Sequence, residues 1–110
     1  MTAPRLTSDF WVQAYIARLR IADIPAFLVA RGDATAGAVL VKLNTLNGRA
    51  KLHGRVLGPD WTPVWSVLAD GPEADVDAAV ARQRRSDPDL WLIEVEDRLG
   101  RTLLDEPGLA

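Results

Sequence analysis

Basic side chains recur at every second position from residue 49 to residue 55, and one more lies at residue 42. Alternate residues of a strand share a face, so the sequence predicts one basic surface here. A surface of this kind attracts phosphates and other anions, nucleic acid included, although this one lacks the interleaved aromatic side chains that stack unpaired bases. The candidate anion-binding residues are Lys42, Arg49, Lys51, His53 and Arg55.

Two structural interpretations compete with anion binding at this face. It is also typical of the solvent-exposed side of a sheet. Alternatively, Glu94 and Glu96 alternate onto one face of a later strand, and a neighbouring strand would pair them with Arg49, Lys51 or Arg55.

The loop at residues 31–37 is a second candidate site. Its two glycines permit positive φ, and its Arg, Asp and Thr side chains are able to converge on a ligand. No Lys-Ser/Thr follows the glycines, so it is not a phosphate-cradling loop. The competing interpretation is a turn in which the Asp accepts hydrogen bonds from nearby amides. The candidate loop residues are Arg31, Gly32, Asp33, Thr35 and Gly37.

Aromatic residues supply the candidates for a partner interface, because Trp and Tyr are favoured at binding hot spots. Trp11 and Tyr15 belong to an unusually apolar segment, and Trp61 stands between Pro59 and Pro63. Core packing is the competing interpretation for the first two.

No catalytic constellation is present. The chain has no cysteine, and its one histidine, His53, lies between cations with no Ser or Asp near it in the sequence. The carboxylate pairs Asp87/Asp89 and Glu94/Glu96 have no histidine beside them, which argues against an enclosed transition-metal site and leaves open a weak magnesium contact. We therefore expect no catalytic residue, no cofactor and no metal site, and an enzyme is not the favoured class.

A helix must position the first two aromatic residues. Thr7 or Ser8 is the expected N-cap, and the helix should run from Asp9 to Ala22, ending before Ile24-Pro25. Its broad apolar arc predicts burial within the monomer, with a subunit interface as the alternative. The arc consists of Trp11, Val12, Tyr15, Ile16, Leu19 and Ala22.

A hairpin must position the basic residues. Asn47-Gly48 favours a two-residue type I′ turn, which would place Leu46 opposite Arg49. One face would then be apolar and face the core, and the other would carry the cations. The predicted apolar face consists of Val39, Val41, Leu43, Thr45, Ala50, Leu52, Gly54 and Val56.

The remaining segments complete one α+β domain over residues 1–110. Ala26–Arg31, Thr62–Ala69 and Leu90–Glu96 are expected strands, Pro63 favouring an edge position or a strand start. A second helix should begin with Pro72 and end at Ser86-Asp87-Pro88, and residues 106–110 should fray. The simplest arrangement is a mostly antiparallel sheet of about five strands, in the order α-β-β-β-β-α-β, with both helices on one face.

Charge and composition set the remaining limits. Residues 1–58 carry eight Lys/Arg against three Asp (net +5), and residues 59–110 carry five Arg against twelve Asp/Glu (net −7). These halves can attract each other within a monomer or between subunits. The lack of cysteine favours a reducing compartment. No signal peptide or membrane span is recognisable, so we expect a cytoplasmic protein without a membrane partner.

Three stretches of the sequence resemble a known family. They are Arg5-Leu6 leading to Phe10-Trp11-Val12, the run from Arg31 to Val41 (RGDATAGAVLV), and the run from Asp89 to Asp97 (DLWLIEVED). Together they are similar to the small uncharacterised alphaproteobacterial proteins of domain-of-unknown-function family 1491. This resemblance implies a bacterial cytosolic protein, and it carries over no activity and no catalytic residue.

Two classes of function follow from these observations. The favoured one is a non-catalytic interaction protein that binds an unknown protein or self-associates, with a homodimer as one form. The alternative is a binder of an anionic ligand, either a nucleotide or a nucleic acid, that uses the basic hairpin face.

Overall fold

The computed structural model describes residues 6–109, and within them the predicted order of elements is confirmed. Arg5, from the first stretch of the family resemblance, and Ala110, from the segment expected to fray, lie outside the described residues. No helix between residues 6 and 109 is long and apolar enough to cross a membrane. The elements are α1 (Ser8–Ile21), β1 (Ala26–Ala30), β2 (Val39–Asn44), β3 (Arg49–Leu57), β4 (Pro63–Pro72), α2 (Glu73–Ser86) and β5 (Trp91–Glu96).

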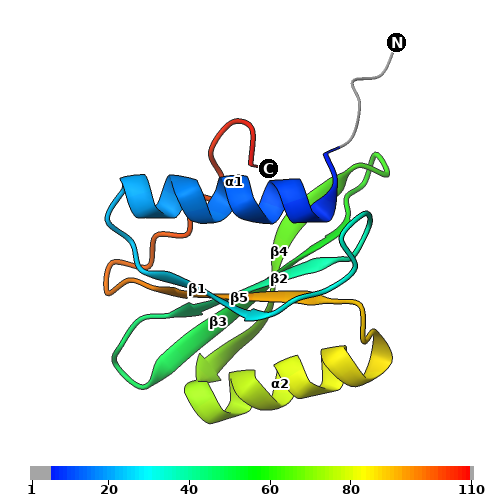
Figure 1. Ribbon diagram of the computed structural model, residues 1–110. Helices are drawn as coiled ribbons and strands as arrows, with labels where there is room; N and C mark the ends of the chain where they lie inside the picture. The colour runs from blue at the N-terminus through cyan, green and yellow to red at the C-terminus, as the bar shows by residue number, and fades with distance from the viewer. Residues whose placement is uncertain (1–5, 110) are drawn as a thin grey trace.

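The five strands form one sheet in the order β1-β5-β2-β3-β4, which lies between the two helices (Figure 1). Neighbouring strands are antiparallel except β2 and β5, which are parallel. The expected α+β class with a mostly antiparallel sheet is therefore confirmed. β4 lies at one edge, as Pro63 predicted, since proline cannot donate to a second neighbour.

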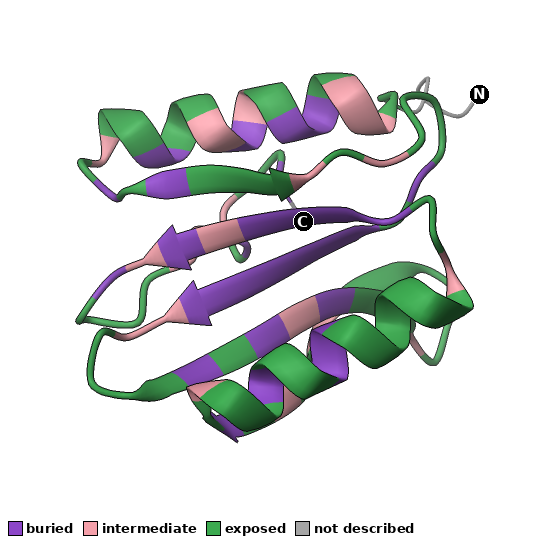
Figure 2. Cartoon of the chain, turned by 60° about the horizontal axis from the view of Figure 1, so that its bottom comes forward, coloured by how far each residue is buried: buried purple, intermediate pink, exposed green. Residues whose placement is uncertain are grey.

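The helices cover opposite faces of the sheet (Figure 1), so the expectation that both pack on one face is wrong. The central strands explain why. β2 and β5 are buried along most of their length (Figure 2), and a strand that is apolar on both sides needs cover on both sides.

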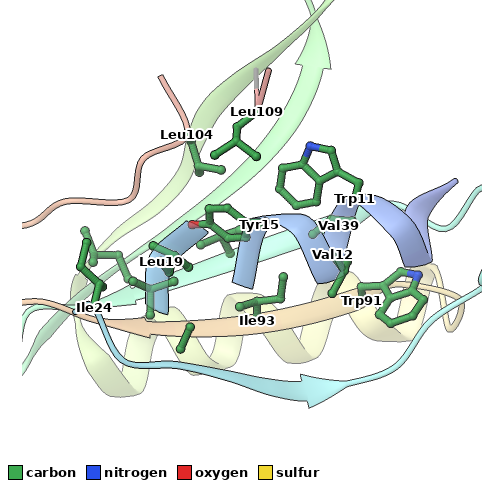
Figure 3. Packing of buried hydrophobic residues seen from close by; sticks show 14 residues of the cluster. Trp11, Val12, Tyr15, Leu19, Ile24, Val39, Trp91, Ile93, Leu104 and Leu109 are labelled. Atoms are coloured by element: carbon green, nitrogen blue, oxygen red, sulfur yellow. The ribbon is translucent and has the colours of Figure 1, made fainter. Parts of the chain in front are cut away.

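The apolar arc of α1 packs inward, as predicted. Thr7 caps this helix by accepting a hydrogen bond from the Phe10 amide at 3.2 Å. Trp11, Val12, Tyr15 and Leu19 are buried against alternate residues of β2 and β5 (Figure 3). Burying side chains of this size contributes about 1.5–3 kcal/mol each. The core between α1 and the sheet is the larger of two hydrophobic cores, one on each face of the sheet.

A narrow apolar stripe of α2 packs on the opposite face of the sheet. Val76, Ala79 and Val80 contact a second core that includes Leu52 and Leu92. Most of the remainder of this helix is solvent-exposed, and the helix ends at Ser86, as predicted.

The turn between β2 and β3 differs from the predicted two-residue turn at Asn47-Gly48. The Thr45 amide donates to the Arg49 carbonyl at 3.3 Å, so the loop holds residues 46–48. Leu46 takes a left-handed conformation with φ 62°, which a leucine adopts only at a cost. The extra loop residue shifts the pairing of the two strands by one position.

This shift overturns the prediction of one wholly apolar face. Val41 lies opposite His53, and Leu43 lies opposite Lys51. A slip of one residue moves every side chain of a strand to the other face. Leu52 consequently packs under α2 while Val41 packs under α1.

The C-terminal segment, residues 102–109, is docked rather than frayed, so that expectation is wrong. Leu104 and Leu109 are buried in the α1 core (Figure 3). The Tyr15 hydroxyl donates to the Thr102 carbonyl at 2.8 Å, and Arg18 pairs with Glu106 at 2.6 Å. Two buried leucines and these polar contacts outweigh the entropy of ordering a short tail.

Candidate functional site

The strongest candidate site lies where β3 and β4 separate from the rest of the sheet. The ladder between β2 and β3 extends to the Val41–His53 pair. β3 continues to Leu57, paired with β4 as far as the Leu57–Pro63 pair. Residues 54–66 therefore form a two-stranded projection, the β3–β4 arm, which extends beyond α1 in Figure 1.

A groove of about 900 Å³ opens beside the β3–β4 arm. We call it the arm groove. The arm, the N-terminal end of α1, the residues just before β2 and the C-terminal end of α2 all contribute to its lining. Most of the lining is apolar, with a few polar groups among it, a composition typical of binding sites. Its apolar members include Leu6, Val56, Leu57, Leu68 and Leu90, and its polar members include Ser8, Arg55, Gln83 and Asp87.

An aromatic and cationic stack lies beside the arm groove, and two of its members, Trp11 and Arg55, line the groove. The Arg55 guanidinium lies 5.0 Å from the Trp11 ring centroid and 4.7 Å from that of Trp65, distances typical of cation–π contacts. The Leu109 carbonyl accepts hydrogen bonds from Trp65 Nε1 at 3.1 Å and from Arg55 at 3.4 Å. The C-terminal segment thus holds this stack in place.

Trp11 also carries an unpaired polar group. Its indole Nε1 is buried and has no hydrogen-bond partner among the described residues, while its side chain lines the arm groove. A buried donor without an acceptor costs about 1–3 kcal/mol.

Apolar side chains are exposed along the β3–β4 arm. Trp61, at its tip, is 80% exposed and has φ 64°, and a bulky residue in that conformation stores strain of the kind found at functional positions. Trp61 is predictable from the sequence, whereas the other exposed residues of the arm, Val56, Leu57 and Val64, are not among the predicted interface residues. The available signal was the apolar pair Val56-Leu57 directly before Gly58-Pro59.

The five basic candidates are not gathered on one face. Lys42 lies on the α2 side of the sheet, with its side chain 7% exposed. Its Nζ is 2.7 Å from carboxylate oxygens of Glu73 and Asp77 and 3.3 Å from Glu94. Burial opposes its charge, but the hydrogen bonds to Asp77 and Glu73 and the nearby Glu94 outweigh burial and raise the pKa of Lys42.

Glu94 therefore pairs with a different cation from the predicted ones. The predicted partners were Arg49, Lys51 or Arg55. However, β5 lies beside β2, where Glu94 is in register with Lys42. Lys42 is the partner of Glu94 because of the strand order, which the sequence did not reveal.

The remaining basic candidates lie along β3. Arg49 is 3.8 Å from Asp70, and Lys51 is exposed. His53 is half-buried, and its Nε2 has no hydrogen-bond partner among the described residues. Burial and, after it, the charge of Lys51 lower the pKa of His53, so the histidine is neutral near pH 7. Arg55 belongs to the aromatic stack.

The 31–37 loop ties α1 to the start of β5. The Ser8 and Asp9 amides donate to the Thr35 and Ala34 carbonyls at 3.1 and 2.9 Å. The Asp33 carboxylate accepts hydrogen bonds from the amides of residues 35 and 36, as the turn interpretation predicted.

The two glycines of this loop serve close approach rather than positive φ, in contrast to the expectation. A Cβ on Gly32 would lie 2.2 Å from the Asp89 carbonyl oxygen, and one on Gly37 would lie 2.5 Å from it. Arg31 lies over the Trp91 ring and 3.7 Å from Asp9. Ligand binding by this loop stays a prediction.

Of the three partner-interface candidates, Trp61 is exposed, whereas Trp11 and Tyr15 are buried. Trp11 nevertheless reaches the arm groove from its core position. In the part of the chain that the structure describes, no group of three or more His, Cys, Asp or Glu residues is placed to hold a metal ion.

Comparisons with known proteins give a family and no activity. The family model described as protein of unknown function DUF1491 matches residues 6–105. A crystal structure of a DUF1491 family protein from Caulobacter crescentus is 40% identical, with a TM-score of 0.84 over 94% of this chain and 98% of that one.

Two solution structures are also similar. An NMR structure of a DUF1491 family protein from C. crescentus is 39% identical, with a TM-score of 0.82 over 96% of this chain and 97% of that one. A protein from A. tumefaciens is 28% identical, with a TM-score of 0.72 over 84% and 86%. No curated protein matches the chain.

Proposed function

This chain belongs to the DUF1491 family, and we propose that it is a non-catalytic interaction module that binds an extended apolar segment of a partner protein in the arm groove. The observation that carries this proposal is the continuation of β3 beyond the end of its pairing with β2, directly beside the groove. An extended segment placed there adds to a strand through its backbone and gains specificity from pockets for alternate side chains.

The backbone geometry supports this mode of binding. In the β2–β3 ladder, the Thr45–Arg49 pair is hydrogen-bonded, and bonded pairs alternate along antiparallel strands. Odd-numbered residues of β3 thus direct their backbone groups toward β2 and, past the end of that ladder, toward the groove. Leu57 is the last of these residues, and an added segment would bond to its amide and carbonyl.

The side chains support an apolar occupant. Val56, Leu57 and Leu68 line the arm groove and are partly exposed, so an apolar segment would remove their surface from water at about 25 cal/mol per Å². Trp61 at the tip of the arm would close over one end of the segment as an aromatic anchor.

We place this module in the bacterial cytoplasm. The support is the chain's lack of cysteine, which suits a reducing compartment, and its similarity to proteins of C. crescentus and A. tumefaciens.

A selection from a random peptide library tests the arm groove directly. We expect the selected peptides to be apolar at alternate positions and to shift the backbone amide signals of residues 54–57 in NMR spectra. Leu57→Lys places a charge at a position that is 60% exposed and should weaken binding at least tenfold, about 1.4 kcal/mol.

Leu99→Lys is the matched control, since Leu99 is also exposed and lies in a turn after β5. It should leave binding unchanged. Peptides that bind Leu57→Lys as tightly as the original chain, or that shift signals elsewhere, would contradict the proposed groove.

Anion binding through β3 is the alternative proposal. Fewer of the predicted basic residues are available to support it. Lys42 is engaged on the other face, and Arg49 has a carboxylate neighbour, which leaves Lys51 as the exposed cation of the predicted set to test. An NMR titration with nucleotides, RNA and DNA should give salt-sensitive shifts around Lys51 if this alternative holds. Lys51→Glu should abolish those shifts, and a silent titration would remove the alternative.

A further inference from the structure

The edge of the sheet opposite the β3–β4 arm is formed by β1. Three consecutive large apolar residues, Phe27, Leu28 and Val29, are exposed on this strand. No charged residue occurs between Ile24 and Ala30. An open edge strand without charge is a template for pairing with another strand, and proteins usually block such edges.

The other edge of the same sheet carries the usual blocks. β4 has a proline at each end, Pro63 and Pro72, and an exposed aspartate, Asp70. Its pairing with β3 also contains an irregularity. These features disfavour the addition of a further strand. The contrast between the two edges indicates that the β1 edge is available for pairing with another strand.

The hydrogen bonds of β1 show which backbone groups face outward. The Glu96 amide donates to the Pro25 carbonyl at 3.0 Å, so Pro25 and, two residues later, Phe27 direct their backbone groups toward β5. Ala26 lies between these two residues, and Leu28 follows Phe27 in the ladder. Their amides and carbonyls consequently point to the free edge.

We propose that β1 pairs with β1 of a second copy of this chain, antiparallel and about a two-fold axis at Phe27. In this register, Ala26 of each copy lies opposite Leu28 of the other, and both residues present their outward backbone groups. The two Phe27 side chains face each other at the centre as a close, non-hydrogen-bonded pair. The irregularity between Leu28 and Ala30 limits the pairing to these residues.

Charges at the two ends of β1 select a second copy of this chain as the occupant. Asp23 precedes the strand and Arg31 follows it, each four positions from Phe27, and both are exposed. Antiparallel pairing brings Arg31 of one copy to the end where Asp23 of the other lies, and this occurs twice about the two-fold axis. A parallel arrangement would bring like charges together instead.

This inference is independent of the proposed function, because β1 and the arm groove lie on opposite edges of the sheet. Sedimentation over a range of concentrations tests it. The unmodified chain should form a dimer, and Phe27→Lys should weaken association at least tenfold by opposing two ammonium groups at the axis. Phe27 is 51% exposed and lies opposite Glu94, so a lysine there should not prevent folding.

The matched control is Val67→Lys on β4, at a position that is also 51% exposed. It should dimerise like the unmodified chain. A chain that stays monomeric at the highest concentration, or a dimer that Val67→Lys disrupts and Phe27→Lys does not, would overturn the proposal.

Two further measurements test the register. Amide hydrogen exchange at Ala26 and Leu28 should slow as the concentration of the unmodified chain rises, and rates that do not depend on concentration would refute the pairing. Asp23→Arg and Arg31→Asp should each weaken self-association several-fold. An equimolar mixture of these two variants should associate again, because opposite charges then meet at both ends, and a mixture that does not would exclude the antiparallel register.

Discussion

The Lys42 ammonium lies 2.7 Å from the Asp77 carboxylate and so joins β2 to α2 across the face of the sheet. Glu73 and Glu94 complete the surroundings of this nearly buried cation. The cluster fixes where α2 sits, because two of its three carboxylates belong to the first turns of that helix. It also takes Lys42 away from the surface on which the sequence had placed it.

Lys42→Met should destabilise the fold by about 3 kcal/mol, since it removes charge-assisted hydrogen bonds and leaves three carboxylates facing one another. The loss is moderated because these carboxylates are partly exposed. Urea unfolding at neutral pH measures it. Lys51→Met, at an exposed position of β3, is the control and should change stability by less than about 0.5 kcal/mol. Equal effects of the two variants would contradict the cluster's role.

Acidification should destabilise the folded chain through His53. Burial, followed by the charge of Lys51, lowers the pKa of His53 below its ordinary 6.5. The unfolded chain thus binds the proton more readily than the folded one. This contribution to stability is fully present above pH 6.5 and is lost as the pH falls below 6.5 through the folded-state pKa.

Unfolding curves at pH 7.5 and at successively lower pH would reveal this loss. His53→Gln should remove the part that develops just below pH 6.5 and leave the dependence at more acidic pH, which arises from carboxylates such as Asp97. An unchanged profile in the variant would show that His53 is not responsible.

Gly32→Ala should cost about 3 kcal/mol, because the new Cβ would collide with the backbone of residues 89 and 90 and with the buried Trp91 ring. The loop would have to withdraw from β5, and the Asp33 carbonyl would lose its hydrogen bond from Trp91 Nε1, now 2.7 Å. Thermal unfolding and Trp fluorescence report both changes. Thr35→Ala in the same loop is the control, and a similar loss there would argue against a specific close approach.

Leu109→Ala should cost about 2–3 kcal/mol, as expected when a fully buried leucine is truncated. Since the Leu109 carbonyl is the acceptor for Trp65 Nε1, loosening this segment should also change Trp fluorescence. Leu99→Ala, at a leucine that is 78% exposed, provides the comparison by chemical denaturation. If the two alanine variants are equally stable, the buried C-terminal segment does not contribute to the stability of the fold.

Local signals in the sequence predicted much of the fold. The Thr7 cap, the end of α2 at Ser86 and the strand that ends at Glu96 are all confirmed. Each depends on residues adjacent in the chain or on one period of alternation. The family resemblance is confirmed as well.

What the sequence could not predict depends on contacts distant in the chain. Asn47-Gly48 fits both a two-residue and a three-residue loop, and the choice rests on side-chain bonds such as that from the Leu46 amide to Asn44 Oδ1 at 2.8 Å. Apolar alternation did not settle the register, because both faces of β2 are covered. The separation of the basic residues and the exposure of the β3–β4 arm follow from that register and from the strand order.

The position of β5 has a consequence for biosynthesis. This strand is the last to be made, yet it occupies the place between β1 and β2 and supplies Trp91, Ile93 and Val95 to the core. A ribosome that has completed only the first four strands therefore carries a nascent chain in which β1 has no neighbour and α1 has no complete surface to cover. Long-range pairing of this kind slows folding, and productive folding must wait until translation has passed Glu96.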